Sequence, residues 1–373
     1  MTRVQLGEIC ERLSSGKSIK AVEVQDLGPY PVIGGNGLRG YAERYNFDGE
    51  CAVIGRQGAA CGNVRFHSGK AYMTEHAVVA VANESSDSHY LAYLLSTMNL
   101  GRLSAQSAQP GLSVKTLSKQ EIYLPPLEKQ KQVVEVLGRI DAKIEANAKL
   151  NGYLEELGQA LTCKYLDSCI SNCLLSDILE LGNGFAFKSG AYTESGRYKV
   201  LTIKNVQDGN VDCSSSSRLD ELPIKMKEHC KLKPGDVVLS LTGNVGRVGI
   251  VAETSCLLNQ RVAVLLPRDE HCLAGLYFVF RQQSFRSKVI GIAKGTAQAN
   301  LSPVETLRLS IPYDESTFQE LSAILRPVFD GILANKIESL KLAKFRNLLL
   351  PKLMSGEIDV SKIDLTQLNS HLA

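Results

Sequence analysis

A glycine-rich stretch is the first candidate for a chemical site in this sequence. Gly35, Gly37 and Gly40 form a G-x-G-x-x-G pattern directly after the apolar run YPVI. In a dinucleotide-binding site, a helix begins at the last glycine and holds the pyrophosphate at its N-terminus. Residues 41–49, YAERYNFDG, show no helical apolar pattern and end in the turn signal Asp-Gly. We therefore interpret Gly35–Gly40 as a flexible turn and expect no bound cofactor.

Two further groups of reactive side chains are weaker candidates. Glu75 and His76 are adjacent and could form an acid–base pair. Cys163, Cys169 and Cys173 lie close together, but no histidine is near them and no C-x-x-C pair occurs, whereas structural zinc sites use tighter ligand pairs. We expect no metal site, and we interpret the ten cysteines as reduced, small apolar residues.

Polar loop segments are the stronger candidates for a binding site. Arg and Lys hydrogen-bond to guanine, Asn and Gln hydrogen-bond to adenine, and Ser, Thr and backbone amides contact phosphates. Any single residue of these types is more simply explained as a solvated or turn-forming residue, but groups at equivalent places in a repeat favour binding. The candidates are Arg39, Arg56, Gln57, Asn63, Arg65, His67, Ser104, Gln106, Ser107 and Gln109, and then Lys204, Asn205, Thr242, Asn244, Arg247, Gln260, Arg261, Lys294, Thr296, Gln298 and Asn300.

Short β-branched runs separated by Gly- and Asn-containing turns predict that these loops are held by strands. The same order, three strands and then a helix, occurs in residues 1–126 and again in residues 168–312. The predicted elements are strands at 30–33, 51–56 and 76–82 with a helix at 89–98, and strands at 198–203, 236–241 and 261–266 with a helix at 273–285.

The two regions also match residue by residue, which indicates a duplicated chain. Glu75 and His76 align with Asn259 and Gln260, so the two copies share no acid–base chemistry at these positions. The matched segments are 62–64 with 246–248, 74–78 with 258–262, and 107–113 with 296–302.

A long amphipathic helix is predicted after each region. Apolar residues recur at alternating steps of four and three from residue 127 and again from residue 320, at a constant offset of 188. A helix of roughly 40 residues spans about 60 Å, more than a local core needs, so the two helices are expected to pair. Pro351 and Gly356 are expected to end the second helix. The predicted pairing residues are Val133, Leu137, Ile140, Ile144, Asn147, Leu154, Leu325, Val328, Ile332, Asn335 and Leu342, and the stripe continues through Leu157 and Phe345.

Asparagines interrupt this apolar stripe at matched positions, Asn147 and Asn335. A polar residue in such a stripe can fix the register of a helix pair at some cost in stability. Alternatively, both side chains simply face solvent where the stripe drifts around the helix. The sequence supports the two interpretations equally.

The order of region, helix, region and helix has a geometric consequence. If the helices pair, the second must run antiparallel to the first, and two similar regions then lie at opposite ends of a rod with an internal pseudo-two-fold. Helix-pair dimers that read duplex DNA contact half-sites about 34 Å or a multiple apart. The expected fold class is α+β, with recognition regions at 1–126 and 168–312, helical spacers at 127–167 and 313–360, and a tail at 361–373.

Composition is consistent with a globular protein of two domains. The chain has 373 residues, 44% hydrophobic content and a mean hydropathy of −0.05. The net charge of +3 is distributed as +1, −1, +4, −1 and 0 over the five segments, so the positive charge lies on the strand-rich regions, as in a polyanion-binding protein. No run of 18 apolar residues and no leader-like N-terminus occurs, so a cytoplasmic protein without a membrane span is expected.

The sequence resembles the specificity (S) subunits of type I restriction-modification systems. IYLPPLEKQKQVVEVLGRID at 122–141 and KFRNLLLPKLMSGEI at 344–358 resemble the central and distal repeats of that family. YPVIGGNGLRGY, GECAVIGRQGAACGNVRF and TEHAVVAV resemble parts of one of its target-recognition domains. The second recognition region matches less closely than the first.

The resemblance implies a non-catalytic subunit that reads a bipartite site in double-stranded DNA. Each recognition domain would read one half, and the helices would set the spacing and dock two methyltransferase (M) subunits, which carry S-adenosylmethionine. Restriction (R) subunits, which use ATP, would join through the core that two M subunits form with one S subunit.

Independently of the resemblance, the sequence contains no [DN]-P-P-[YF] motif for methylating adenine, no G-x-x-x-x-G-K-[ST] motif for ATP and no convincing cluster of nuclease carboxylates.

Two other classes of protein remain as alternatives. A coiled-coil scaffold would not need two basic, loop-rich regions and would show no salt-dependent affinity for DNA. An enzyme with an unrecognised site is disfavoured because the matched positions in the two regions differ chemically.

Overall fold

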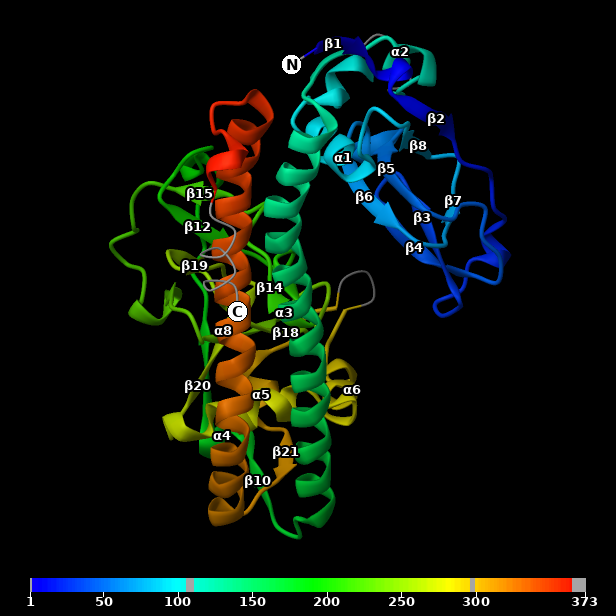
Figure 1. The fold of residues 1–373 in the computed structure, drawn as a ribbon. Helices are drawn as coiled ribbons and strands as arrows, with labels where there is room; N and C mark the ends of the chain where they lie inside the picture. Colours follow the sequence, from blue (N-terminus) through cyan, green and yellow to red (C-terminus); the bar gives the residue numbers. More distant parts are fainter. Residues whose placement is uncertain (1, 105–110, 296–298, 364–373) are drawn as a thin grey trace. The chain divides into compact units, whose positions relative to one another are not determined.

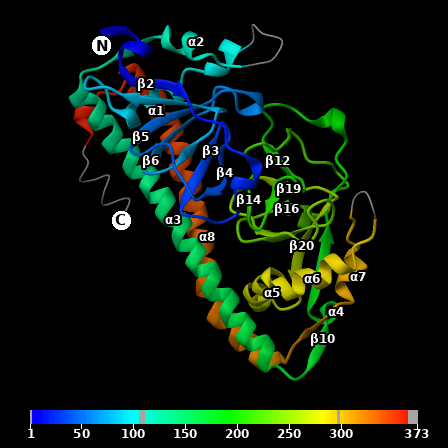
Figure 2. The same ribbon diagram turned by 90° about the vertical axis from the view of Figure 1, so that its right-hand side faces the viewer.

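The computed structural model describes residues 2–104, 111–295 and 299–363. It divides into two compact units. The first unit contains Met1–Lys143 and Ala343–Ala373, and the second contains Ile144–Leu342. Both units combine strands and helices, and each includes part of the two long helices, α3 (Leu127–Ser168) and α8 (Glu315–Ser355) (Figures 1 and 2).

The first unit is built on a four-stranded antiparallel sheet with the order β2-β8-β5-β6. A three-stranded sheet, β4-β3-β7, and a two-stranded sheet, β1-β9, complete it. Its elements are β1 (Thr2–Gln5), β2 (Cys10–Ser15), β3 (Tyr30–Gly34), β4 (Gly37–Ala42), β5 (Glu50–Gly55), β6 (Val64–Ser68), β7 (Tyr72–Met73), β8 (Ala77–Ala82), α1 (Ser88–Ser96), the 3-10 helix η4 (Leu100–Ser104), α2 (Val114–Ser118) and β9 (Glu121–Leu124).

The second unit contains a larger, mixed sheet with the order β11-β20-β17-β18-β14-β13. A four-stranded sheet, β15-β12-β19-β16, and the pair β10-β21 complete it. Its elements are β10 (Asn172–Leu174), α4 (Leu175–Ile178), β11 (Leu179–Asn183), β12 (Tyr198–Leu201), β13 (Val206–Gln207), β14 (Gly209–Val211), β15 (Arg218–Leu219), β16 (Lys231–Leu232), β17 (Val237–Ser240), β18 (Val248–Ile250), β19 (Cys256–Leu258), β20 (Val262–Pro267), α5 (Leu273–Arg281), α6 (Gln283–Gly291), α7 (Pro303–Leu307) and β21 (Ser310–Pro312).

The predicted repeat is visible in the main-chain hydrogen bonds of the two sheets. The same type of β-bulge occurs where β5 pairs with β6 and where β17 pairs with β18. Gly62 N donates to Gly55 O at 2.8 Å and Gly55 N to Asn63 O at 2.8 Å, while Gly246 N donates to Ser240 O at 3.1 Å and Ser240 N to Arg247 O at 2.9 Å. Gly62 and Asn63 are therefore the equivalents of Gly246 and Arg247, as the sequence match predicts.

One predicted match is wrong by a single residue. Met73 pairs with Ile33, and Leu258 pairs in the same parallel manner with Leu201. Residues 74–78 are thus equivalent to 259–263 and not to 258–262. Glu75 and His76 correspond to Gln260 and Arg261, so the two copies still share no acid–base pair.

The predicted single helix at 273–285 is also wrong, because α5 and α6 are separated at Gln282. The backbone of Gln282 is extended, with φ −64° and ψ 131°. Its Nε2 donates to the carbonyl of Gln159 at 2.8 Å, which holds this residue against α3. Two helices of nine residues each replace the predicted one.

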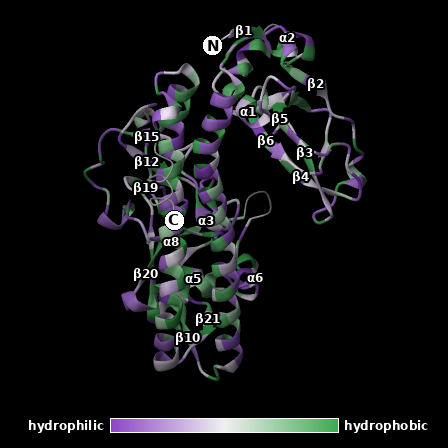
Figure 3. Cartoon of the chain, viewed as in Figure 1, coloured by the Kyte–Doolittle hydropathy of each residue, from purple (hydrophilic) through white to green (hydrophobic). Residues whose placement is uncertain are grey.

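The two long helices pair antiparallel in each unit, as their matched stripes predict. In the first unit, Asp141 of α3 contacts Arg346 of α8. In the second, Asn147 contacts Glu338, and Asn151 contacts Asn335, so residue numbers rise along α3 as they fall along α8. Figure 3 shows hydrophobic and hydrophilic residues alternating along both helices, as expected for elements with one buried stripe.

Most of the predicted pairing residues are buried. Asn147 is only 4% exposed, and its Nδ2 donates to Glu338 Oε2 at 2.7 Å, so it does not face solvent. Leu157 and Phe345, which belong to the predicted stripe, are 49% and 48% exposed. A straight helix has 3.6 residues per turn, so a stripe with alternating steps of four and three gradually rotates around its surface. Val133, Leu137, Ile140, Asn147, Leu325, Val328 and Ile332 are buried, and Ile144, Leu154, Asn335 and Leu342 are half-buried.

Pro351 does not end the second helix, contrary to the prediction. It lies inside α8, which continues to Ser355. The helix ends at Gly356, whose φ of +76° is the left-handed conformation typical of a residue just past a helix C-terminus. Among the residues described, no helix is long and apolar enough to cross a membrane.

Candidate nucleic-acid interface

Three loop segments converge at one end of the main sheet in the first unit. The first follows β5, the second precedes β8, and the third precedes α2. Arg56 N donates to His76 O at 2.9 Å, and Leu112 N donates to Arg56 O at 2.9 Å. Gln57 and Gly111 form an isolated antiparallel bridge beside them. The side chains of three segments distant in sequence are thereby presented together.

The second unit repeats this convergence with the same hydrogen bonds. Leu241 N donates to Arg261 O at 3.0 Å, and Leu301 N donates to Leu241 O at 2.7 Å. Thr242 and Asn300 form the isolated bridge, and Thr242 Oγ1 donates to Asn300 Oδ1 at 3.0 Å. The repeat therefore extends from the strands to the loops that they carry.

A surface hollow of about 440 Å³ accompanies the first convergence. It is lined by Asn36 and Arg39 from the β3–β4 hairpin, and by Gln57 and His76 from the loops after β5 and before β8. His76 Nδ1 lies 3.2 Å from Gln57 Oε1, a contact that fixes the two side chains relative to each other at the hollow. Arg39 and Gln57 are exposed, so their hydrogen-bonding groups are available to a ligand.

The glycine-rich stretch that resembled a dinucleotide motif is this β3–β4 hairpin. Gly34 pairs with Gly37, and Gly37 has a φ of +98°, a conformation that glycine adopts without strain. A strand, not a helix, follows the last glycine. The hairpin has no helix N-terminus on which a pyrophosphate could lie.

The second convergence also presents cationic and amide side chains. Gln260, Arg261 and Lys294 are exposed there. Lys294 pairs with Asn300 through the backbone, and its Nζ donates to Glu305 Oε1 at 2.8 Å, which lowers the pKa of the Glu305 carboxyl. Arginine, lysine, glutamine and asparagine in one place form the donor and acceptor set that contacts base edges and phosphates.

Several predicted contact residues serve the fold instead of lying exposed at these surfaces. Asn205 is 3% exposed, and its Oδ1 accepts from Thr202 N at 2.9 Å while its Nδ2 donates to Asp212 O at 2.8 Å. Ser104 is 9% exposed and donates to Gly101 O at 2.7 Å. Burial lowers the pKa of His67, whose Nε2 lies 3.3 Å from Gly69 O.

The remaining predicted residues fall into four groups. Lys204 and Asn244 are exposed, and Arg247 lies on the ion cluster of the β13–β14 hairpin. Asn63 and Arg65 line a separate cavity. Gln106, Ser107, Gln109, Thr296 and Gln298 lie outside the residues that the structure describes.

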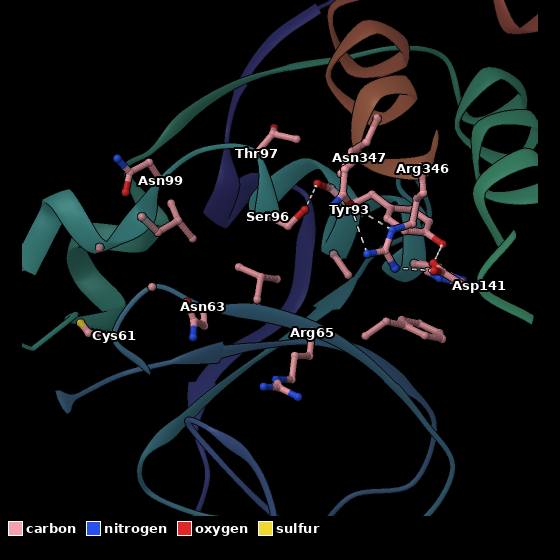
Figure 4. Close-up of a pocket in the computed structure, with 18 residues that line it drawn as sticks. Cys61, Asn63, Arg65, Tyr93, Ser96, Thr97, Asn99, Asp141, Arg346 and Asn347 are labelled. Carbon is pink, nitrogen blue, oxygen red and sulfur yellow. Dashed lines mark hydrogen bonds and ion pairs between the residues drawn. The ribbon is translucent and has the colours of Figure 1, made fainter. Parts of the chain in front are cut away.

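That separate cavity, of about 880 Å³, lies beside β6 in the first unit (Figure 4). Arg65 and Asn63 line it from β6 and the preceding loop, Ser96 and Thr97 from the end of α1, and Asn347 from α8. An ion pair closes one side: Asp141 accepts from Tyr93 Oη at 2.5 Å and from Arg346 Nη1 at 2.5 Å.

An aromatic stack forms another side of the cavity. The rings of Phe66 and His89 lie 3.8 Å apart and 6° from parallel, and those of His89 and Tyr93 lie 4.7 Å apart. Burial lowers the pKa of His89, which favours a neutral imidazole between the two rings.

Sequence reasoning misses Asn36 and His76 as parts of the first interface. The glycines around Asn36 suggest only a turn, and the position of His76 next to Glu75 suggests only an acid–base pair. The order of the strands in the sheet identifies both residues. Because β5 and β8 are antiparallel neighbours, the end of β5 lies beside the start of β8.

Two α+β units, each with a main sheet that carries the same loop convergence and with paired long helices, define a duplicated protein whose converging loops present residue types that contact nucleic acid. Comparison with known proteins gives the family. The family model described as "Type I restriction modification DNA specificity domain" matches residues 1–156 and 172–342. The chain therefore belongs to the family of type I restriction-modification specificity subunits, a non-catalytic DNA-recognition family.

Individual relatives agree with this family. The chain is 38% identical over 143 residues to the type I restriction enzyme EcoprrI specificity subunit of Escherichia coli, a match that covers 37% of this chain and 35% of the relative. It is 25% identical over 310 residues to the MjaIX specificity subunit of Methanocaldococcus jannaschii, covering 74% of this chain and 70% of the relative. The match to the first relative thus spans about a third of its length.

A solved structure shares the fold. The crystal structure of the type I restriction-modification S subunit from M. genitalium superposes with a TM-score of 0.60. The superposition covers 94% of this chain and 95% of that one at 16% sequence identity. The mixed α and β composition, the two domains and the long helices are therefore those of an S subunit.

Proposed function

We propose that this chain reads a bipartite site in double-stranded DNA, with one half read by each unit. The observation that carries the proposal is the repeated loop convergence, in which Arg56, His76 and Leu112 make the same main-chain bonds as Leu241, Arg261 and Leu301. Two equivalent surfaces with different side chains suit two half-sites of different sequence. The recognition domains are proposed to extend over residues 1–126 and 168–312.

The side chains of the two surfaces give each half-site reader its chemistry. In the first, Arg39 supports a guanine contact and Gln57 an adenine contact, because these are the bidentate pairings of those side chains in the major groove. In the second, Arg261 and Gln260 supply the same two types, and Lys294 and Asn300 add a phosphate and a base contact. The spacers at 127–167 and 313–360 would fix the distance between the half-sites.

The helices also support docking of two methyltransferase subunits. Leu150, Tyr153 and Leu157 of α3 are 47%, 68% and 49% exposed, and they follow each other at steps of three and four on one helix face. On α8, Phe345 and Leu348 are 48% and 70% exposed, and Phe345 is the repeat equivalent of Leu157. Exposed apolar stripes of this kind mark interaction surfaces. S-adenosylmethionine would be held by the methyltransferase subunits and ATP by restriction subunits that join the core.

The test is to purify the chain with the methyltransferase subunit encoded beside it and to map methylated adenine in DNA treated with the complex. The proposal expects one motif made of two short specified halves separated by unspecified bases. A single uninterrupted motif, or methylation without sequence preference, would contradict the reading by two units. A complex that fails to form would contradict the docking.

A further inference from the structure

The main sheets of the two units end differently, although they are copies of each other. The order β2-β8-β5-β6 in the first unit corresponds to β11-β20-β17-β18 in the second. In the second unit the sheet continues past β18 with β14 and β13. In the first unit it stops at β6, and none of the strands in the described part of the chain pairs with the outer edge of β6. An edge strand presents unpaired N–H and C=O groups to any chain that can reach them.

The second unit covers its edge with a hairpin of its own chain. β14 runs parallel to β18, with Gly209 opposite Gly249 and Asn210 opposite Ile250. Asp208, in the turn between β13 and β14, holds the hairpin in place through three guanidinium groups. Arg286 lies 3.1 Å, Arg281 3.5 Å and Arg247 3.9 Å from its carboxylate oxygens.

The first unit has a cavity where the second has this hairpin and its arginines. Arg247 is equivalent to Asn63 through the shared bulge, and Arg281 is equivalent to Ser96, since each is the last residue of a nine-residue helix. At the same offset of 185 residues, Arg286 is equivalent to Gly101. Asn63, Ser96 and Gly101 all line the cavity of about 880 Å³ beside β6. Short neutral residues thus replace three arginines, and the space that those arginines and the hairpin fill is open.

We propose that the outer edge of β6 and this cavity bind an extended, acidic segment of a partner polypeptide, which adds a strand to β6 as β14 adds one to β18. The proposal rests on the proposed function, because the partner is the methyltransferase subunit. Strand addition to an exposed edge is a general mode of peptide recognition, in which main-chain bonds give affinity and pockets for alternate side chains give specificity.

The charge of the cavity favours an acidic segment. Asp141 and Arg346 form an ion pair, and burial lowers the pKa of His89, which favours its neutral form. Arg65 is exposed and leaves the lining with an excess positive charge. A carboxylate of the bound segment would pair with the Arg65 guanidinium, as Asp208 pairs with arginines in the second unit.

The Arg65 side chain also limits the distance between the bound segment and β6. Its equivalent is Gly249, where an added Cβ would lie 2.4 Å from Asn210 O. A strand cannot approach Arg65 as closely as β14 approaches Gly249. It can pair with β6 at the ordinary spacing of about 4.8 Å, at which neighbouring side chains point out of the sheet and do not obstruct pairing.

Hydrogen exchange of the β6 amides tests the proposal in the complete complex. Gly55 N donates to Asn63 O and Gly55 O accepts from Gly62 N. Hydrogen-bonded and non-hydrogen-bonded pairs alternate along antiparallel strands, so the N–H groups of Val64, Phe66 and Ser68 point away from β5. Assembly with the methyltransferase subunit is expected to slow exchange at Phe66 and Ser68 at least tenfold. The matched internal control is β18, already paired with β14, whose amides should change less than twofold.

A charge variant distinguishes direct binding of an acidic segment at β6 from an indirect effect of assembly on exchange. Arg65→Glu should abolish most of the added protection at Phe66, and Arg65→Lys should keep it. Unchanged exchange at β6 in an assembled complex would overturn this inference alone. Protection produced by duplex DNA without the methyltransferase subunit, or by raising the concentration of the chain alone, would overturn it in favour of DNA or a second copy. Failure to assemble would contradict the proposed function as well.

Discussion

Replacing Asp141 by alanine should destabilise the first unit by about 2–4 kcal/mol. The carboxylate accepts one hydrogen bond from Tyr93 of α1 and one from Arg346 of α8, both at 2.5 Å. A hydrogen bond to a charged group contributes about 1.5–3 kcal/mol, and the lower part of that range applies here because Asp141 and Arg346 are 31% and 32% exposed and solvent screens them. The loss would also leave the buried hydroxyl of Tyr93 without its acceptor.

The assay is urea unfolding followed by pulsed hydrogen exchange, which reports the two units separately. Asp330→Ala is the matched control, since its partner Arg326 lies 2.8 Å away in the same helix and the side chains are 54% and 50% exposed. An exposed pair of this kind is worth about 0.3–0.5 kcal/mol. Tyr93→Phe should cost the first unit about half of the Asp141→Ala loss. A loss below about 0.5 kcal/mol for Asp141→Ala, no larger than that of the exposed pair, or an equal loss in the second unit, would refute the reasoning that this carboxylate joins α1, α3 and α8.

Three further perturbations test other parts of the fold. Gly158→Ala should lower the free energy of unfolding by about 1–3 kcal/mol, because its Cβ would lie 2.2 Å from an aromatic ring of α5. Gly152→Ala, in the same helix, adds a Cβ that meets no other atom and should raise the free energy of unfolding by about 0.5–1 kcal/mol. A larger loss of stability for Gly152→Ala than for Gly158→Ala in thermal unfolding would contradict this. The half-buried His89 has a lowered pKa, so the unfolded chain binds more protons and the first unit should lose stability as the pH falls from 7 to 5. His89→Phe should flatten that dependence, and a slope unchanged by the substitution would exclude His89 as its source. Asn147→Leu with Asn335→Leu should raise the melting temperature but loosen the register of the helices, measured as a lower yield of one engineered disulfide across α3 and α8, and an unchanged yield would argue against a register role.

The long helices were predictable because their signal is local and periodic. Forty residues with apolar positions every three or four steps define an amphipathic helix whatever the rest of the chain does. Their antiparallel pairing followed from the duplicated stripe. The end of α8 was not predictable in the same way, since Pro351 lies in the last turns, where an exposed position within a packed helix tolerates a missing hydrogen bond.

The residue types at the candidate interfaces were predictable, but which individual residues lie there was not. Arg39, Gln57 and Arg261 have residue types that contact nucleic acid, and the structure places them at the converging loops. Asn205 has the same residue type but hydrogen-bonds its own turn, which is the usual competing use of an asparagine. A sequence gives residue type directly, whereas the partner of a polar side chain depends on contacts distant along the chain.

The sequence contains a clear signal for the β13–β14 hairpin. VQDGNV places Asp208-Gly209 between two short β-type runs, the strongest short-range indication of a hairpin. Its consequence was not readable. Only the register of the sheets shows that this hairpin covers an edge that the other copy leaves open.

The central claim, that each unit reads its own half of one DNA site, is tested most directly by mapping methylated adenine with two paired variants. Arg39→Ala with Gln57→Ala alters only the first interface, and Arg261→Ala with Lys294→Ala alters only the second. Each pair is expected to relax the specified bases of a different half-site and to leave the other half and the spacer unchanged. Relaxation of the same bases by both pairs, or an unaltered motif in both, would contradict the account.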